Sequence, residues 1–236
     1  MAEQANMGCS YASSKGPMMK FSFFMMPLHH PKENPALAFQ RDISLIHLAD
    51  DLDFDEFMIG EHHSGGWETM PLPEMALSMA AANAHRIRLG TSVVNLPFHH
   101  PFHVAERIAF LDHLTRGRAI LGIGPSNLVT DKRLFAIAQD TLYPMMRESV
   151  DLIVKFLETS DPFDHDGEFW NFREMRLQLR SYQQPRLPLA IASTSGSDDV
   201  LDLAARHGMI LMSGVGKKRP KGLAENWARF GELATK

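Results

Sequence analysis

The sequence predicts an α/β fold in which a parallel sheet curls into a barrel. Apolar, strand-like segments alternate with amphipathic helical segments along almost the whole chain, which is typical of parallel strands joined by right-handed helical crossovers. Three of the apolar segments end abruptly in histidine pairs, at His29–His30, His62–His63 and His99–His100. Because an α/β barrel carries its functional residues where the strands end, we expect these pairs at one rim.

Bulk composition excludes several other classes of protein. The 236 residues are 44% hydrophobic and 22% charged, which is ordinary for a globular domain. A formal net charge of −4 gives no reason to expect nucleic acid as a partner. No apolar run is long enough to span a bilayer, so we expect no membrane partner either. The single cysteine, Cys9, fits a reducing compartment, and we expect a cytoplasmic protein.

Local signals place the elements of the first half of the chain. Asn34-Pro35 pairs a capping side chain with proline at the first helical position, so it predicts a helix start. Thr115-Arg116-Gly117 predicts a helix end, because glycine is common just past a helix. The predicted order is a strand at 21–28, a helix from 34 to about 52, a strand at 57–60, a helix at 71–84, a strand at 86–97 and a helix from 101.

The second half continues the alternation with one interruption. Asp166-Gly167 lies between two short extended runs and predicts a hairpin insertion near 163–180. The other predicted elements are strands at 118–124, 187–193 and 209–213, helices around 146–157 and at 198–207 and 223–234, and a basic loop at 214–222. We expect residues 1–18 to be a disordered extension and residues 19–236 to form a single barrel domain.

The strongest candidate site is Glu61-His62-His63. An acid beside imidazole can fix its tautomer and hold it for proton transfer near neutral pH. Strand alternation predicts Glu61 and His63 on one face and His62 on the other. Adjacent histidines on a strand do not readily share one ion, and His-x-His is absent, so we predict no metal site. The competing interpretation is that most of the six paired histidines are solvated rim residues.

Two further strand ends are suited to a ligand. Thr194, Ser195 and Gly196 precede a predicted helix, where hydroxyls and backbone amides favour an anion such as phosphate. Gly124 and Ser126 follow another strand, and glycine there lets a flat ligand approach the backbone. The competing interpretations are a plain serine cap and a plain turn. The two aspartates after Ser197 argue against an anion.

A set of motifs resembles one known family. The motifs are Pro27-x-His-x-Pro31, Gly60-Glu-His-His63, the strand Leu89–Pro97, Leu111-Asp-His-Leu-Thr-Arg-Gly-Arg118 and Ala192-Ser-Thr194. In this order they resemble the bacterial luciferase-like flavin-dependent monooxygenases, and within them the limonene 1,2-monooxygenase branch. The resemblance runs from about residue 20 to about residue 230.

The resemblance implies a TIM-type (β/α)₈ barrel that uses reduced FMN and dioxygen to oxygenate a small apolar, terpene-like substrate. It implies a flavin reductase or NAD(P)H as the electron source, and a homo-oligomer. His62 would be catalytic, supported by Glu61 and His63. The cofactor residues that it implies are Ser92, Val93 and Asn95 beneath the ring, often with a cis non-proline peptide, Gly124 and Ser126 beside it, and Thr194, Ser195 and Gly196 at the phosphate. Pro125 replaces the arginine that the luciferases proper carry near this phosphate.

Three alternatives stay open beside this hypothesis. The chain contains about six predicted strands, so we expect a C-terminally truncated barrel, and a non-catalytic or vestigial flavin-binding fragment is one alternative. A metal-dependent hydrolase on the same barrel is another. The sequence also does not separate FMN from a deazaflavin cofactor.

Overall fold

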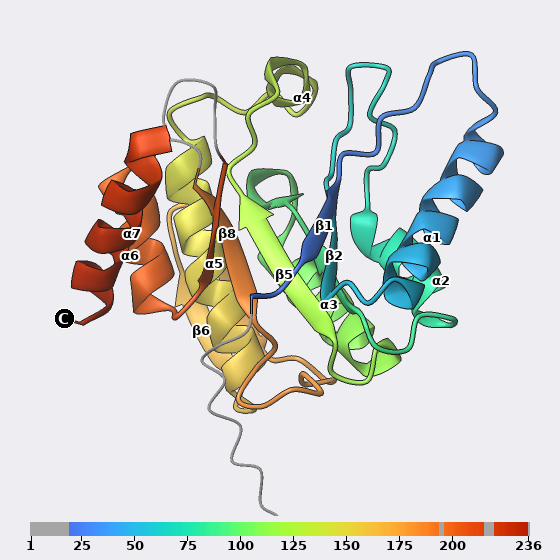
Figure 1. The fold of residues 1–236 in the computed structure, drawn as a ribbon. Coiled ribbons are helices and arrows are strands. Elements are labelled where there is room, and N and C mark those ends of the chain that lie inside the picture. Colours follow the sequence, from blue (N-terminus) through green and yellow to red (C-terminus); the bar gives the residue numbers. More distant parts are fainter. Residues whose placement is uncertain (1–18, 194–195, 215–219, 236) are drawn as a thin grey trace, which may run out of the picture.

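A parallel sheet curved into a half-barrel forms the centre of the molecule (Figure 1). The structure is a computed structural model and describes residues 19–193, 196–214 and 220–235. The main sheet has six parallel strands in chain order, with β1 and β9 at its edges: β1 (Ser22–Met25), β2 (Glu56–Ile59), β3 (Arg88–Thr91), β5 (Ala119–Gly124), β8 (Leu189–Ser193) and β9 (Ile210–Ser213). The predicted fold class, a TIM-type barrel represented by about six strands, is confirmed.

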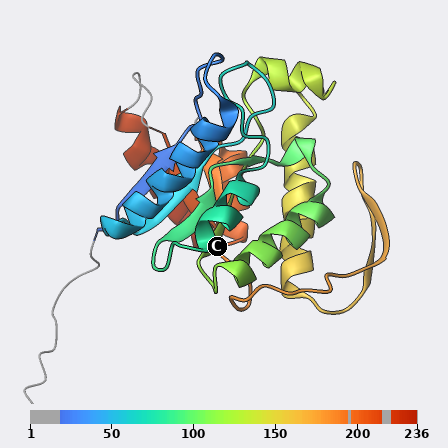
Figure 2. The same cartoon turned by 90° about the vertical axis from the view of Figure 1, so that its right-hand side faces the viewer.

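Most helices pack on the outer, convex face of this sheet (Figures 1 and 2). They are α1 (Pro35–Asp51), α2 (Pro73–Ala81), α3 (Pro101–Leu114), α5 (Leu142–Glu158) and α6 (Asp198–Arg206). Helix α4 (Val129–Leu134) lies instead at the rim, beyond the carboxyl end of β5, and α7 (Pro220–Ala234) packs against α6. The predicted start of α1 is confirmed, since the Asn34 side chain accepts a hydrogen bond from Ala36 N at 2.9 Å. Helix α2 begins two residues later than predicted, at the second of two prolines. Among the described residues, no helix combines the length and the apolarity that crossing a membrane requires.

The core lies between the strands and these helices. Phe57 of β2 and Leu89 of β3 are fully buried against helix residues such as Ile46 and Leu77. Burying a side chain of this size contributes about 1.5–3 kcal/mol, so each of these residues stabilises the fold substantially. All six residues of β5 are buried, which is why that strand shows no alternation in sequence.

The strand predicted at 86–97 is divided. β3 ends at Thr91, the Ser92–Val93 peptide is cis, and pairing with β5 resumes at β4 (Val94–Asn95) before a 3₁₀ turn, Leu96–Phe98. At the break the Thr91 hydroxyl donates to Gly122 O at 2.8 Å and accepts from Gly122 N at 2.9 Å. The Thr91 side chain thus takes the place of backbone-to-backbone hydrogen bonds between the strands at this point. The apolar pattern of the sequence does not reveal this substitution.

An antiparallel hairpin, β6 (Phe163–Asp166) and β7 (Asn171–Met175), interrupts the βα alternation between α5 and β8. In Figure 2 this orange segment lies along the outside of α5. Glu148 of α5 fastens the turn, because its carboxylate accepts from Phe169 N and Trp170 N at 3.0 Å. The predicted N-terminal extension at 1–18 and most of the predicted basic loop, 215–219, lie outside the described residues.

Candidate active site

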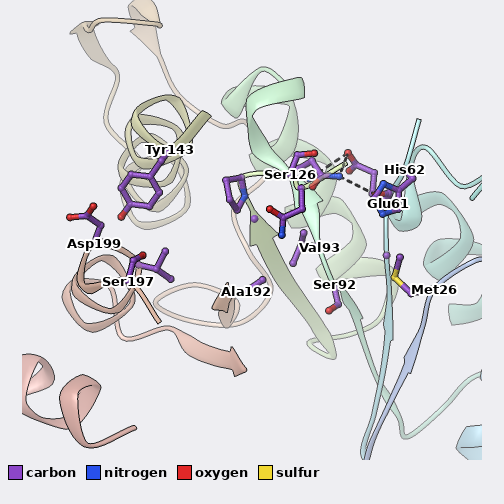
Figure 3. Close-up of a pocket in the computed structure, with 16 residues that line it drawn as sticks. Met26, Glu61, His62, Ser92, Val93, Ser126, Tyr143, Ala192, Ser197 and Asp199 are labelled. Carbon is purple, nitrogen blue, oxygen red and sulfur yellow. Dashed lines mark hydrogen bonds between the residues drawn. The ribbon is translucent and has the colours of Figure 1, made fainter. Parts of the chain in front are cut away.

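A cavity of about 640 Å³ opens at the carboxyl ends of the strands (Figure 3). Its walls come from the segments that follow β1, β2, β3, β5 and β8 and from the first turns of α5 and α6. Residues that the sequence predicted from separate strand ends therefore meet in one place. The predicted residues that line it are Glu61, His62, Ser92, Val93, Asn95, Gly124 and Ser126.

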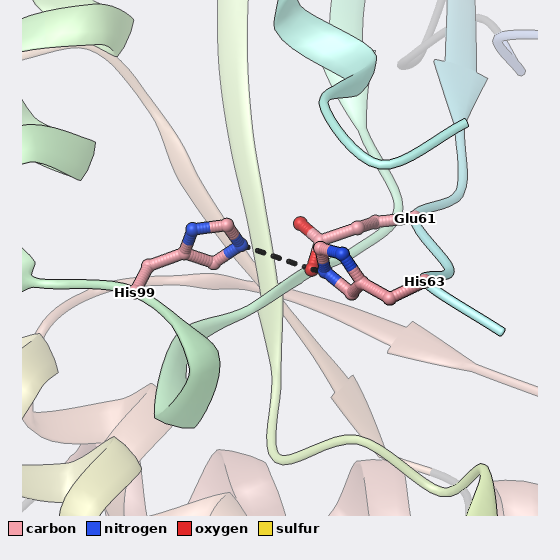
Figure 4. A group of neighbouring side chains, drawn as sticks. All are labelled: Glu61, His63 and His99. Carbon is pink, nitrogen blue, oxygen red and sulfur yellow. Dashed lines mark hydrogen bonds and ion pairs between the residues drawn. The ribbon is translucent and has the colours of Figure 1, made fainter. Parts of the chain in front are cut away.

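Glu61 is the centre of a buried hydrogen-bond cluster on one side of the cavity (Figure 4). Its Oε1 accepts from His63 Nε2 at 2.9 Å and from His99 Nε2 at 3.0 Å. Asn95 adds its Nδ2 donor, 3.0 Å from the Glu61 carbonyl oxygen and 3.3 Å from Oε1. Asn95, predicted as a cofactor residue, thus also holds Glu61 in place.

Burial raises the pKa of Glu61, but the hydrogen bonds from His63 and His99 lower it by more, so its pKa is below the ordinary 4.5. The group is therefore a carboxylate at neutral pH. One ligand atom each of Glu61, His63 and His99 lie within 4.8 Å of one another, and this arrangement is also compatible with a metal ion. We interpret the group as hydrogen-bonded, because both histidine-to-Oε1 distances are ordinary hydrogen-bond lengths.

This cluster predicts how stability depends on pH. A folded-state pKa below the unfolded value stabilises the fold above the unfolded value, and this contribution is lost as pH falls through the folded pKa. The wild type should therefore be more stable than Glu61→Gln at neutral pH, and the difference should shrink below the ordinary value of 4.5. Denaturant unfolding of both proteins from about pH 6 to about pH 3 measures it. A difference that stays constant would contradict the prediction.

His62 lies on the cavity wall, and both of its ring nitrogens face carboxylates. Nδ1 is 3.0 Å from Asp131 Oδ2, and Nε2 is 3.0 Å from Glu68 Oε2. Asp131 is fully buried in the first turn of α4 and also accepts from His63 N at 3.3 Å. His62 and the Glu61–His63 pair have different side-chain partners, although Glu61 and His62 both line the cavity and all three residues lie beyond the end of β2. The ring is held too firmly for a freely solvated residue.

The floor of the cavity is a close approach between Val93 and Gly124. A Cβ built on Gly124 would lie 2.7 Å from Val93 Cγ2, so only glycine fits beside that side chain. Beyond it, Ser126 has φ +72° and a buried hydroxyl without a hydrogen-bond partner. The Tyr143 hydroxyl is likewise buried and unpartnered, and burial, aided by Asp199, raises the pKa of Tyr143 to about 12. These hydroxyls are available to a ligand.

The far end of the cavity meets the start of α6. Ser197, at the N-cap position of α6, lines the cavity, and Gly196 before it has φ +65°. A Cβ on Gly196 would lie 2.2 Å from the Asn226 amide, so a larger residue there would displace that side chain. Asp199 lines the same end, as the sequence argument against an anion anticipated. Thr194 and Ser195, predicted with Gly196 to bind phosphate, lie outside the described residues.

The interpretation of most of the paired histidines as solvated is wrong. Of the six, only His30 is exposed. His29 is buried between Asp42 and Thr69, and His100 packs against Trp170 and Phe172. Sequence analysis did not single out Glu68 or Tyr143. Neither belongs to a motif, and each reaches the cavity only through the fold of its loop or helix.

A cavity and a histidine–carboxylate cluster lie at the carboxyl ends of the strands of a half-barrel, where α/β barrels carry their functional residues, and sequence comparison identifies the family. The sequence model of the luciferase-like monooxygenase family matches residues 19–236. The chain belongs to this family, as the resemblance predicted.

Two relatives illustrate the similarity. The chain is 38% identical over 195 residues to 4-hydroxyprotoasukamycin monooxygenase of Streptomyces nodosus subsp. asukaensis, covering 83% of this chain and 52% of the relative. It is 34% identical over 218 residues to limonene 1,2-monooxygenase of Rhodococcus erythropolis, covering 91% and 55% respectively. The chain thus spans about half the length of the curated relatives that it matches.

Solved structures show the same fold. Monooxygenase RslO1 from Streptomyces bottropensis superimposes with a TM-score of 0.85 at 27% identity, over 92% of this chain and 66% of that one. The oxygenating constituent of 3,6-diketocamphane monooxygenase from Pseudomonas putida, a type II Baeyer-Villiger monooxygenase solved in complex with FMN, gives 0.81 at 26% identity, over 92% and 62%.

Proposed function

We propose that this chain is the FMN-binding part of a flavin-dependent monooxygenase that oxygenates a small apolar substrate. The observation that carries the proposal is the cavity itself, which joins a fixed histidine at one end to the start of α6 at the other. Membership of the luciferase-like monooxygenase family supports it.

The residues present fit a flavin. The close approach of Val93 and Gly124 makes a flat floor suited to a planar ring. The unpartnered hydroxyls of Ser126 and Tyr143 suit the polar groups of a sugar-like tail. A phosphate would then lie near Ser197 and the N-terminus of α6, where backbone amides favour negative charge and would have to outweigh the repulsion from Asp199.

Reduced FMN, when bound, would supply the electrons that activate dioxygen. The protein's own contribution is positioning and exclusion of water. His62 would present a fixed donor at the cavity wall, with Asp131 and Glu68 orienting the ring. Glu61, kept ionised by His63 and His99, would fix the strand end from which His62 projects.

The substrate, the electron donor and the oligomer belong to the same proposal. Apolar groups of Met26, Val93, Pro125, Ala192 and Val200 line the cavity, which supports a small apolar substrate of the terpene kind. A relative named as the oxygenase component of a flavin-dependent trigonelline monooxygenase from Acinetobacter baylyi supports a separate flavin reductase as partner. We propose a homo-oligomeric assembly as well.

Cofactor titrations test the proposal. FMN should bind more tightly than riboflavin, by roughly ten-fold or more, because each hydrogen bond to a charged group contributes about 1.5–3 kcal/mol. Quenching of flavin fluorescence gives both dissociation constants. Equal affinities would remove the phosphate site from the proposal.

Two alternatives are tested beside it. A deazaflavin added in the same titration should bind more weakly than FMN. If the deazaflavin binds more tightly, it replaces FMN as the proposed cofactor. The Glu61, His63 and His99 triad also supports a metal-dependent hydrolase as a second candidate. Stoichiometric zinc or iron in the purified chain, together with weak flavin binding, would favour that candidate.

A further inference from the structure

Residues 67–70 cross the rim above the ends of β1 and β2. Leu28 and Glu68 form an antiparallel bridge, and His29 N donates to Trp67 O at 2.6 Å. On the other side His62 N donates to Met70 O at 3.1 Å. This 67–70 segment is therefore tied by backbone hydrogen bonds to both strand ends, although it belongs to neither strand.

A series of side-chain hydrogen bonds also holds the 67–70 segment in place. His29 Nε2 is 2.7 Å from Asp42 Oδ2 of α1, and His29 Nδ1 is 2.7 Å from Thr69 Oγ1. His29 and Asp42 are almost fully buried, and neither reaches the cavity. Breaking the buried His29–Asp42 pair is costly, so the His29 ring is fixed, and its contact with the Thr69 hydroxyl orients this residue. The preceding residue, Glu68, is fixed with it.

The locked segment places the Glu68 carboxylate at His62. Asp131 already holds Nδ1 from α4, and Glu68 approaches Nε2 from the opposite side, each at 3.0 Å. Only the doubly protonated ring can donate to both carboxylates, because a neutral ring has one N–H. The other charged groups nearby, Glu61, His63 and His99, bond to one another.

We propose that Glu68 is a positioning residue for His62, which fixes the ring from the side opposite Asp131. Its functional meaning rests on the proposed function, in which His62 acts at the cavity wall. The Asp42–His29–Thr69 chain then has a purpose, since it holds the 67–70 segment where Glu68 meets His62. Glu68 is itself half-buried.

The test replaces only the charge, with Glu68→Gln. Carbon-13 relaxation NMR of histidine-labelled protein, at one fixed pH, measures how far the His62 ring moves, and its signals are assigned by their loss in His62→Gln. In Glu68→Gln the ring should be more mobile than in wild type, because a charge-assisted hydrogen bond at Nε2 is replaced by a weaker neutral one. The kcat of turnover should fall several-fold with little change in KM, and Thr69→Val should give a smaller effect on both.

Glu106→Gln is the matched control. Glu106 also pairs with a histidine, His103, at 3.1 Å, but both side chains are exposed on α3. Glu106→Gln should leave the mobility of the His62 ring and the turnover unchanged. Mobility of the His62 ring that is identical in wild type and Glu68→Gln, with both proteins folded by circular dichroism, would overturn the proposal. The NMR measurement needs no flavin, so it stands even if FMN fails to bind, and that failure would count against the proposed function alone.

Discussion

His62→Ala is expected to lower oxygenation turnover by roughly a hundred-fold or more, the range supplied by a positioned acid–base group. The variant removes the ring that Asp131 and Glu68 hold at the cavity wall. FMN affinity should change little, because the floor at Val93 and Gly124 stays intact. Turnover with reduced FMN and dioxygen, with an added reductase, is the measurement, made in this chain and in a full-length relative with the same Gly-Glu-His-His motif.

His85→Ala is the control for that experiment. His85 is exposed at the loop before β3, at the opposite end of the strands from the cavity, and should leave turnover unchanged. If His62→Ala in the full-length relative retains wild-type turnover while binding FMN normally, His62 is a rim residue without a catalytic role. If both variants lose turnover equally, the loss reflects folding.

Gly122→Ala is expected to lower the free energy of unfolding by roughly 3 kcal/mol, through overpacking and lost buried hydrogen bonds. An added Cβ would lie 2.0 Å from Thr91 O, a backbone atom that cannot move without displacing β3. The same shift would break both bonds between the Thr91 hydroxyl and Gly122. Denaturant unfolding measures the loss.

Gly231→Ala provides the opposite case. Gly231 lies within α7, and a Cβ there would meet nothing within 4 Å. Alanine favours a helix interior over glycine by about 0.5–1 kcal/mol, so this variant should be slightly stabilised. Similar losses in the two variants would show that the Thr91–Gly122 contact is not what makes Gly122 necessary.

The sequence predicted the parts of the site that local pattern determines. Glu61 and His62 follow a buried apolar strand, and both line the cavity at its carboxyl end. The break after Thr91 was not predictable in this way, because a hydroxyl replaces backbone groups without changing the apolar pattern. Glu68 was missed because its position depends on a bridge to Leu28, forty residues earlier, and on a buried histidine.

The strand order has a consequence for how the sheet assembles. Each strand of the main sheet pairs with the next one to leave the ribosome, so during synthesis every new strand meets a partner that is already present. Ser22 and Glu56 pair across 34 residues, whereas Leu121 and Leu189 pair across 68, because α4, α5 and the hairpin intervene. Loop-closure entropy grows only with the logarithm of length, so this doubling costs about 0.6 kcal/mol. The long segment between β5 and β8 therefore delays the pairing of these two strands without altering the order in which the sheet assembles.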